Sequence, residues 1–195
     1  PTHICARLAD GAVVREEFNV RGLNKPPIAE VFLEPADVQP SEDALEEINR
    51  FGIIVIGPGS LFTSVITNLL VPGISRAIRQ SNARVIYVCN IMTQPGQTDG
   101  FNASAHVRAV QRYLGEGVLD HVIVNDKRPP DAILAPYAAE KAEMVALDED
   151  LPRLGVNVVR ADIVEAVDEK RILWEKQDIL RHDPRKLADI IMSLR

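Results

Sequence analysis

The feature that most strongly constrains the fold of this chain is an apolar run followed by a glycine-bearing loop and a second apolar run of helical spacing. Residues 51–56 read FGIIVI, which is short, apolar and rich in β-branched residues. Such a run is typical of a buried strand, and the sequence GPGS at 57–60 predicts a tight loop directly after it. Apolar residues then recur at helical spacing before a Pro-Gly stop signal, at Leu61, Val65, Leu69 and Leu70 ahead of Pro72 and Gly73. This spacing predicts a helix after the loop.

The loop between the two runs is a candidate phosphate site. A strand, a glycine loop and a helix N-terminus together present free backbone N–H groups and the positive end of the helix dipole to an anion. Glycine lets the ligand approach the backbone, and a serine hydroxyl adds a donor. An ordinary strand-to-helix turn shows the same pattern, since Gly-x-Gly alone is a weak signal. The candidate ligand-binding residues here are Gly57, Pro58, Gly59 and Ser60.

The composition is that of a globular protein with an acidic balance. A chain of 195 residues that is 46% hydrophobic and 26% charged can bury a sizeable core. The net charge of -6 argues against non-specific binding to nucleic acid or to an anionic membrane, because both need clustered basic charge. No apolar run approaches the roughly 20 residues of a membrane span. Cys5 and Cys89 lie in apolar strand-like runs, which predicts buried reduced thiols, no metal site and a cytoplasmic protein.

The rest of the pattern predicts an α/β fold. Residues 3–20 form two strand-like stretches joined by Asp10-Gly11, a hairpin signal, and residues 28–33 offer another strand. Further short apolar runs lie at 85–89, 121–124, 144–147 and 156–159, and helical stretches at 41–50, 103–114, 131–141 and after Asp183-Pro184. This alternation predicts a mostly parallel sheet with helices on both faces and right-handed crossovers. We expect one domain over 1–195, with a β-hairpin and strand excursion at 1–34 and the Rossmann-like core at 51–195.

Polar residues follow the ends of three predicted strands, where ligands of open α/β sheets bind. Besides the glycine loop, these are Asn90, with the polar connection 92–102 after it, and Asn125. We expect all three to face one crevice. Asp99 could serve as a metal ligand or general base, although Asp-Gly is also a common turn. The spacing supports no Ser-His-Asp or Cys-His set, so no catalytic residue is predicted.

Three runs resemble the gluconeogenesis-factor family of YvcK-like proteins, relatives of the 2-phospho-L-lactate transferases (CofD) of deazaflavin coenzyme synthesis. The runs are IGPGSLFTSVITNLLVPGI, VCNIMTQPGQTDGFNASAHVRAVQRYLG and VIVND. The resemblance implies a Rossmann-like fold, a cytoplasmic location and binding of uridine-diphosphate sugars such as UDP-N-acetylglucosamine. It also implies a role in cell shape and cell-wall precursor metabolism. Tyr137 and Arg181 match positions that help hold the nucleotide sugar in that family.

The chain departs from the family pattern in two ways. The family begins with a strand and glycine-rich loop that would lie ahead of Pro1, so this chain resembles its C-terminal part. We therefore expect an exposed strand edge, and with it homo-oligomerisation or association with the missing N-terminal segment. The transferases usually carry Asn-Pro inside the loop after Gly-Pro, whereas residues 59–61 read GSL here. This favours a non-catalytic nucleotide-sugar-binding regulator with no certain cofactor; the alternative is a phospholactate-type transferase that uses a divalent metal such as Mg²⁺.

Overall fold

The computed structural model describes residues 2–166 and 180–195, and the strands within these ranges form two sheets. The smaller sheet is antiparallel with strand order β2-β1-β3, formed by β1 (His3–Leu8), β2 (Val13–Arg15) and β3 (Ile28–Glu34). The larger sheet is parallel with order β4-β5-β6-β7, formed by β4 (Ile53–Ile56), β5 (Arg84–Val88), β6 (His121–Asn125) and β7 (Asn157–Ala161). The predicted α/β fold with an N-terminal antiparallel excursion is confirmed.

The small sheet is built on the predicted hairpin. Its turn is closed by the Asp10 carboxylate, which accepts a hydrogen bond of 3.0 Å from the Ala12 N–H. The second strand is shorter than the apolar stretch suggested, because the chain turns into the four-residue helix α1 (Glu17–Val20). Val20 of this helix is fully buried, so the apolar residue at the end of the stretch enters the core from a helix instead of a strand.

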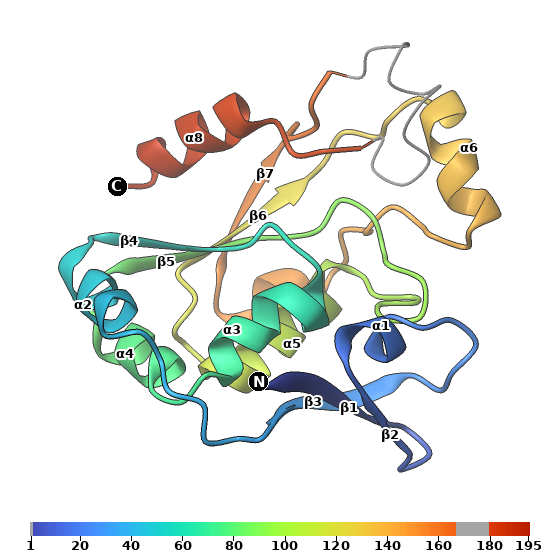
Figure 1. Ribbon diagram of the computed structural model, residues 1–195. Coiled ribbons are helices and arrows are strands. Elements are labelled where there is room, and N and C mark those ends of the chain that lie inside the picture. The colour runs from blue at the N-terminus through green and yellow to red at the C-terminus, as the bar shows by residue number, and fades with distance from the viewer. Residues whose placement is uncertain (1, 167–179) are drawn as a thin grey trace.

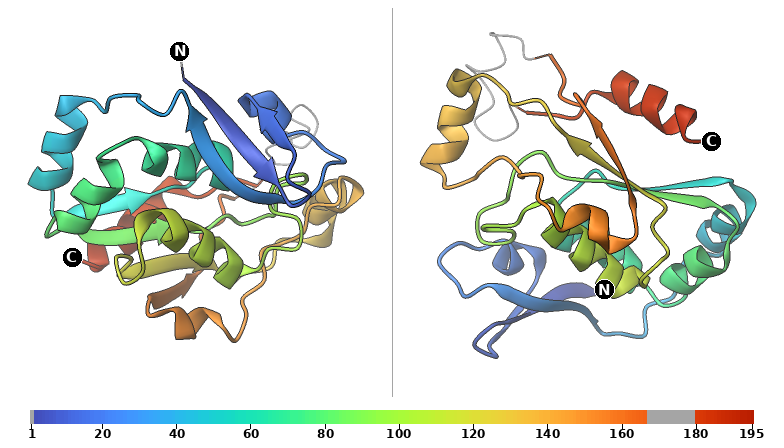
Figure 2. Two further views of the ribbon diagram at one scale, coloured as in Figure 1. Left: turned by 90° about the horizontal axis from the view of Figure 1, so that it is seen from below. Right: turned by 180° about the vertical axis from the view of Figure 1, so that it is seen from behind.

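The helices cover both faces of the parallel sheet (Figure 1). They are α2 (Glu42–Arg50), a π-helical turn η1 (Leu61–Ile66) continuing into α3 (Thr67–Leu70), α4 (Ile74–Gln80), α5 (Ala103–Leu114), α6 (Asp131–Ala139), a 3₁₀ turn η2 (Leu151–Leu154) and α8 (Pro184–Ser193). On one face, Leu187 of α8 packs against the β5 and β6 side chains Ile86 and Ile123. The other face packs against η1, α3 and α5, beyond which the small sheet lies (Figures 1 and 2).

Local capping signals set the helix boundaries. The Asn102 side chain accepts a hydrogen bond from the Ala105 N–H at the start of α5. The Asp183 carboxylate accepts from the N–H groups of Arg185 and Lys186, with Pro184 in the first helical turn of α8. Side-chain acceptors of this kind satisfy the backbone donors that a helix leaves free at its N-terminus. The side chains of Asn102 and Asp183 therefore mark the starts of α5 and α8, whereas Ser41 at the start of α2 makes no side-chain cap hydrogen bond.

The apolar run at 144–147 does not form a strand of the parallel sheet, so this element was wrongly predicted. Met144 makes only an isolated antiparallel bridge with Met92. The backbone of the run instead binds neighbouring loops: the Val145 N–H donates to the Ile91 carbonyl, and the Ala146 carbonyl accepts from the Ala103 N–H. These hydrogen bonds satisfy polar groups of the backbone, and the Val145 side chain is buried. The run can therefore lie in the interior without pairing as a strand of the sheet.

The two cysteines are free and buried, as expected. Burial raises the pKa of the Cys89 thiol to about 12, so this thiol stays protonated at neutral pH. Within residues 2–166 and 180–195, no single helix is long and apolar enough to cross a membrane. The segments Leu61–Leu70 and Ile74–Gln80 meet the length and composition criteria only as a pair, which is bent by 75°.

The outer edge of β4 has no strand partner among the described residues. Near it, Val55 is 40% exposed and Phe51 is 57% exposed. An apolar open edge of this kind promotes strand addition. We propose that it mediates self-association, and we expect sedimentation velocity to show an average mass that rises with protein concentration. Val55→Lys should shift the distribution toward monomer, and a wild-type chain that stays monomeric at every concentration would contradict the proposal.

Candidate functional site

A cavity of about 1140 Å³ lies past the carboxyl ends of β4 and β5. Its walls come from the glycine loop, the polar connection after β5, the end of α6, the residues before α8 and the segment after α1, which meet on one side of the molecule (Figure 1). Drug-sized ligands occupy sites of roughly 300–1,000 Å³. This cavity therefore has room for a larger ligand, such as a nucleotide joined to a second group. Of the predicted residues, its lining includes Pro58, Gly59, Ser60, Asn90, Tyr137 and Arg181.

The glycine loop is held close to its neighbours by its backbone shape. Gly57 has φ of 84°, and a Cβ there would lie 3.1 Å from the Val88 carbonyl oxygen. A Cβ on Gly59 would lie 3.3 Å from Cβ of Ser64 in the following helix. Glycine is therefore required at the first position for its backbone conformation, and at the second for a tight approach between loop and helix.

Two side-chain amides fix the loop from the β5 side. The Asn90 amide donates a hydrogen bond of 2.9 Å to the Gly59 carbonyl oxygen, and the Gln94 amide donates one of 2.9 Å to Oγ of Ser60. The other amide atoms, Oδ1 of Asn90 and Oε1 of Gln94, are buried without a hydrogen-bond partner among the described residues. Since buried acceptors are costly when unsatisfied, these two oxygens are suited to accept hydrogen bonds from a ligand or from ordered water.

Tyr137 and Arg181 reach the cavity from α6 and from the residues before α8. The Tyr137 hydroxyl accepts a 2.9 Å hydrogen bond from the Leu180 N–H, which ties the end of α6 to the residues before α8. The Arg181 carbonyl accepts a 2.9 Å bond from the Glu165 N–H, so its backbone is fixed while its side chain lies at the exposed rim. An aromatic ring and a guanidinium brought to one cavity can bind a flat base or sugar and an anion.

His182 completes this wall. Its Nε2 lies 3.2 Å from the Cys89 carbonyl oxygen, and a neutral imidazole with its proton on Nε2 would donate to that oxygen. Burial lowers the pKa of His182, with a smaller opposing effect from this hydrogen bond. The imidazole is therefore neutral at pH 7 and links the residues before α8 to the end of β5.

Gly57 and Asn125, although predicted as ligand-binding residues, do not line the cavity. Asn125 is 5% exposed. Its side chain donates a hydrogen bond of 2.7 Å to the Lys127 carbonyl and accepts one of 3.3 Å from the Ile163 N–H. These bonds brace the chain after β6 against the chain after β7. The third predicted loop thus lies on the same edge of the sheet, but its asparagine has a structural role.

The segment after α1 supplies cavity residues that sequence reasoning did not identify: Arg21, Leu23, Asn24 and Lys25. In the sequence this segment is only a break before Pro26-Pro27. Its polar and basic residues gave the one available signal, although basic residues occur in many solvent-exposed loops. Lys141 and His182 were likewise not identified.

Among the described residues of the cavity wall, basic groups outnumber acidic ones. The lining contains Arg21, Lys25, Lys141 and Arg181 against Asp99 and Glu140. This balance favours an anionic ligand. The Mg²⁺ of the transferase alternative is not matched by the described residues, which contain no group of three or more His, Cys, Asp or Glu side chains placed to hold a metal ion. The Asp99 carboxylate instead accepts a hydrogen bond of 2.8 Å from the Gly96 N–H, which stabilises the turn.

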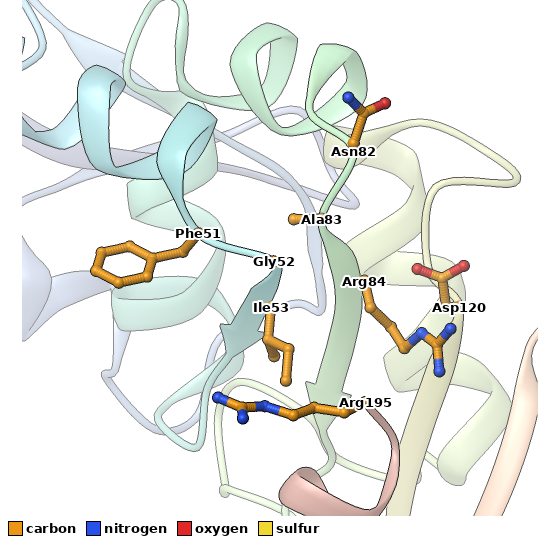
Figure 3. A pocket seen from close by; sticks show the side chains of 8 residues that line it. All are labelled: Phe51, Gly52, Ile53, Asn82, Ala83, Arg84, Asp120 and Arg195. Atoms are coloured by element: carbon orange, nitrogen blue, oxygen red, sulfur yellow. The ribbon is translucent and has the colours of Figure 1, made fainter.

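A second cavity of about 540 Å³ lies at the amino-terminal edge of β4 and β5. Figure 3 shows Arg84, Asp120 and Arg195 around it, with the Phe51 ring at its rim. It is on the wrong edge of the sheet for the usual ligand position. One Asp120 carboxylate oxygen also accepts 2.7 Å from the Val85 N–H, so this residue supports the start of β5. The larger cavity is therefore the candidate site.

The chain is similar to proteins named gluconeogenesis factor. It is 43% identical over 187 residues to the one from Halalkalibacterium halodurans, covering 95% of this chain and 55% of that protein. It is 37% identical over 190 residues to the one from Bacillus subtilis, covering 97% and 57%. A putative gluconeogenesis factor from Thermotoga maritima is 44% identical over 192 residues, covering 96% and 57%. The chain thus spans little more than half the length of these relatives.

A crystal structure of a UPF0052-family protein from Bacillus halodurans has the same fold. It superposes with a TM-score of 0.89 at 42% sequence identity, covering 98% of this chain and 58% of that one. The family model described as 2-phospho-L-lactate transferase CofD matches residues 1–164, a range that includes both sheets and the glycine loop. On this match, the chain belongs to the CofD family.

Proposed function

We propose that this chain forms the binding site for a nucleotide sugar of the UDP-N-acetylglucosamine type. The observation that carries the proposal is the cavity of about 1140 Å³ at the carboxyl edge of the sheet, walled by Gly59, Ser60 and a surplus of basic side chains. The loop offers backbone N–H groups and a hydroxyl to a diphosphate, while Arg181 offers charge-assisted hydrogen bonds. The aromatic ring of Tyr137 offers a flat face to the base or sugar.

The proposed biological role follows from what the resemblance to gluconeogenesis factors implies. We propose that the protein acts in the cytoplasm as a non-catalytic regulator that links nucleotide-sugar supply to cell shape and cell-wall precursor metabolism. The CofD family name supports a phospholactate-type transferase as the alternative. The transferase would use a divalent metal such as Mg²⁺ and the regulator would not, so dependence on Mg²⁺ separates the two candidates.

Calorimetry of the protein with UDP-N-acetylglucosamine, with and without Mg²⁺, tests this proposal. We expect saturable binding that does not require Mg²⁺, with no release of free nucleotide over hours at 25 °C. Nucleotide release that depends on Mg²⁺ would favour the transferase. Absence of binding under both conditions would refute the proposed ligand class.

Arg181→Ala should weaken binding of UDP-N-acetylglucosamine by about 1.5–3 kcal/mol, the usual worth of a hydrogen bond to a charged group. Because Arg181 is exposed, contacts of its side chain within the protein contribute little to stability, and we expect the apo melting temperature to move little. Calorimetry and a thermal melt of the unliganded protein measure the two effects separately. A lowered melting temperature with unchanged affinity would instead give Arg181 a structural role.

A further inference from the structure

The wall segment, residues 21–25, connects the small sheet to the candidate site. It follows α1, precedes β3, and is separated in sequence from the parallel strands that define the binding edge. Lys25 is half-buried in this wall, while Arg21 and Leu23, which precede it in the segment, are exposed. The small sheet therefore contributes one partly desolvated cation to a cavity otherwise built by the larger sheet.

The Lys25 ammonium is held in place by the loop after β5. Its Nζ donates to the Gly96 carbonyl, and the N–H of the same glycine donates 2.8 Å to the Asp99 carboxylate. Ordering a flexible Lys side chain costs rotamer entropy, which a ligand would otherwise have to overcome. Here the protein has already fixed the side chain, so its charge is pre-organised in the cavity wall.

The Lys25 ammonium also has N–H donors that no described residue accepts. A lysine has three N–H donors, and the Gly96 carbonyl takes one of them. Burial lowers the pKa of Lys25, and the nearby Asp99 carboxylate opposes this shift to a lesser extent. The wall thus contains a partly desolvated cation, and the neighbouring Asp99 carboxylate is already hydrogen-bonded to a backbone N–H. An anionic ligand group would accept hydrogen bonds from the remaining N–H donors of the ammonium.

We propose that Lys25 is a specificity-determining residue that donates to a phosphate oxygen of the ligand. The inference rests on the proposed nucleotide-sugar function. It gives the small sheet a share, beside the glycine loop and Arg181, in the discrimination between phosphorylated and unphosphorylated ligands, because its loop supplies this fixed charge.

Lys25→Met tests the inference, because methionine retains most of the apolar stem and removes the charge. Calorimetry should show affinity for UDP-N-acetylglucosamine reduced roughly 10- to 100-fold, the effect of losing a charged hydrogen bond, with affinity for uridine changed less than about twofold. Lys25→Arg should recover part of the preference for the phosphorylated ligand. Lys127→Met is the matched control, since Lys127 pairs with Asp162 and does not line the cavity.

The outcomes separate this inference from the function on which it rests. Equal binding of UDP-N-acetylglucosamine by wild type and Lys25→Met would overturn the role of Lys25 and leave the function standing. If the wild type does not bind the nucleotide sugar, inorganic pyrophosphate serves as the second probe. Weaker binding of pyrophosphate by Lys25→Met would support Lys25 as an anion contact with the nucleotide class wrong, and no binding of pyrophosphate by wild type would overturn both.

Discussion

Gly59→Val is expected to reduce affinity for UDP-N-acetylglucosamine at least about 100-fold, which is near 3 kcal/mol. A branched side chain here would occupy the space above the loop that a phosphate needs. The loss would match about two charge-assisted hydrogen bonds from backbone N–H groups. The Cβ atom of the valine would already lie 3.3 Å from Cβ of Ser64. The rest of the side chain must therefore project into the cavity or displace the start of the helix. Calorimetry measures the effect.

Gly52→Val is the matched control at the other end of the same strand. A Cβ on Gly52 has no heavy atom within 4 Å, and this glycine does not have a positive φ. The control should keep wild-type affinity. If Gly59→Val binds as tightly as Gly52→Val while both melt like the wild type, the glycine loop does not contact the ligand.

Gly96→Ala is expected to lower the free energy of unfolding by about 2–5 kcal/mol. Gly96 has φ of 77°, where an L-residue costs about 1–2 kcal/mol. Its Cβ would also lie 2.5 Å from the Gly22 carbonyl oxygen, a backbone atom that cannot move alone. Forcing apart two packed segments costs a further 1–3 kcal/mol or so. Urea unfolding followed by circular dichroism measures the change.

Gly100→Ala separates the two causes. Gly100 has φ of 70°, but a Cβ there meets nothing within 4 Å. This variant should therefore show only the conformational cost of about 1–2 kcal/mol. Equal destabilisation by the two substitutions would mean that the contact between the wall segment and the loop after β5 relaxes without cost.

The fold was predictable where local patterns and burial agree. The runs at 85–89 and 121–124 are apolar throughout because β5 and β6 are interior strands, covered by α8 on one face and by α5 and its neighbours on the other. The caps at Asn102 and Asp183 use short-range hydrogen bonds, which the sequence specifies directly. By contrast, the run at 144–147 has the same composition as a strand, and only its tertiary partners decide that it is not one.

The candidate site was predictable in its position and only partly in its members. The polar residues after β4 and β5 follow from sheet topology, since the carboxyl ends of parallel strands share one edge. No such rule places Lys25, because its position depends on how a separate antiparallel sheet docks against that edge. Asn125 shows the converse case. It stands at the right edge, but its side chain is used by backbone groups on either side.

Helix α6 gives the site an energetic property that its static contacts do not show. Only Ile133 of its residues is buried, and Pro136 inside it removes one backbone hydrogen bond. Elements with so little burial open at low free energy, so α6 should exchange its amide hydrogens well before the sheet does. Ligand contact with Tyr137 would slow that exchange, and part of the binding energy would go into ordering α6. The measured affinity would then understate the strength of the contacts, and the order of α6 would report whether the cavity is filled.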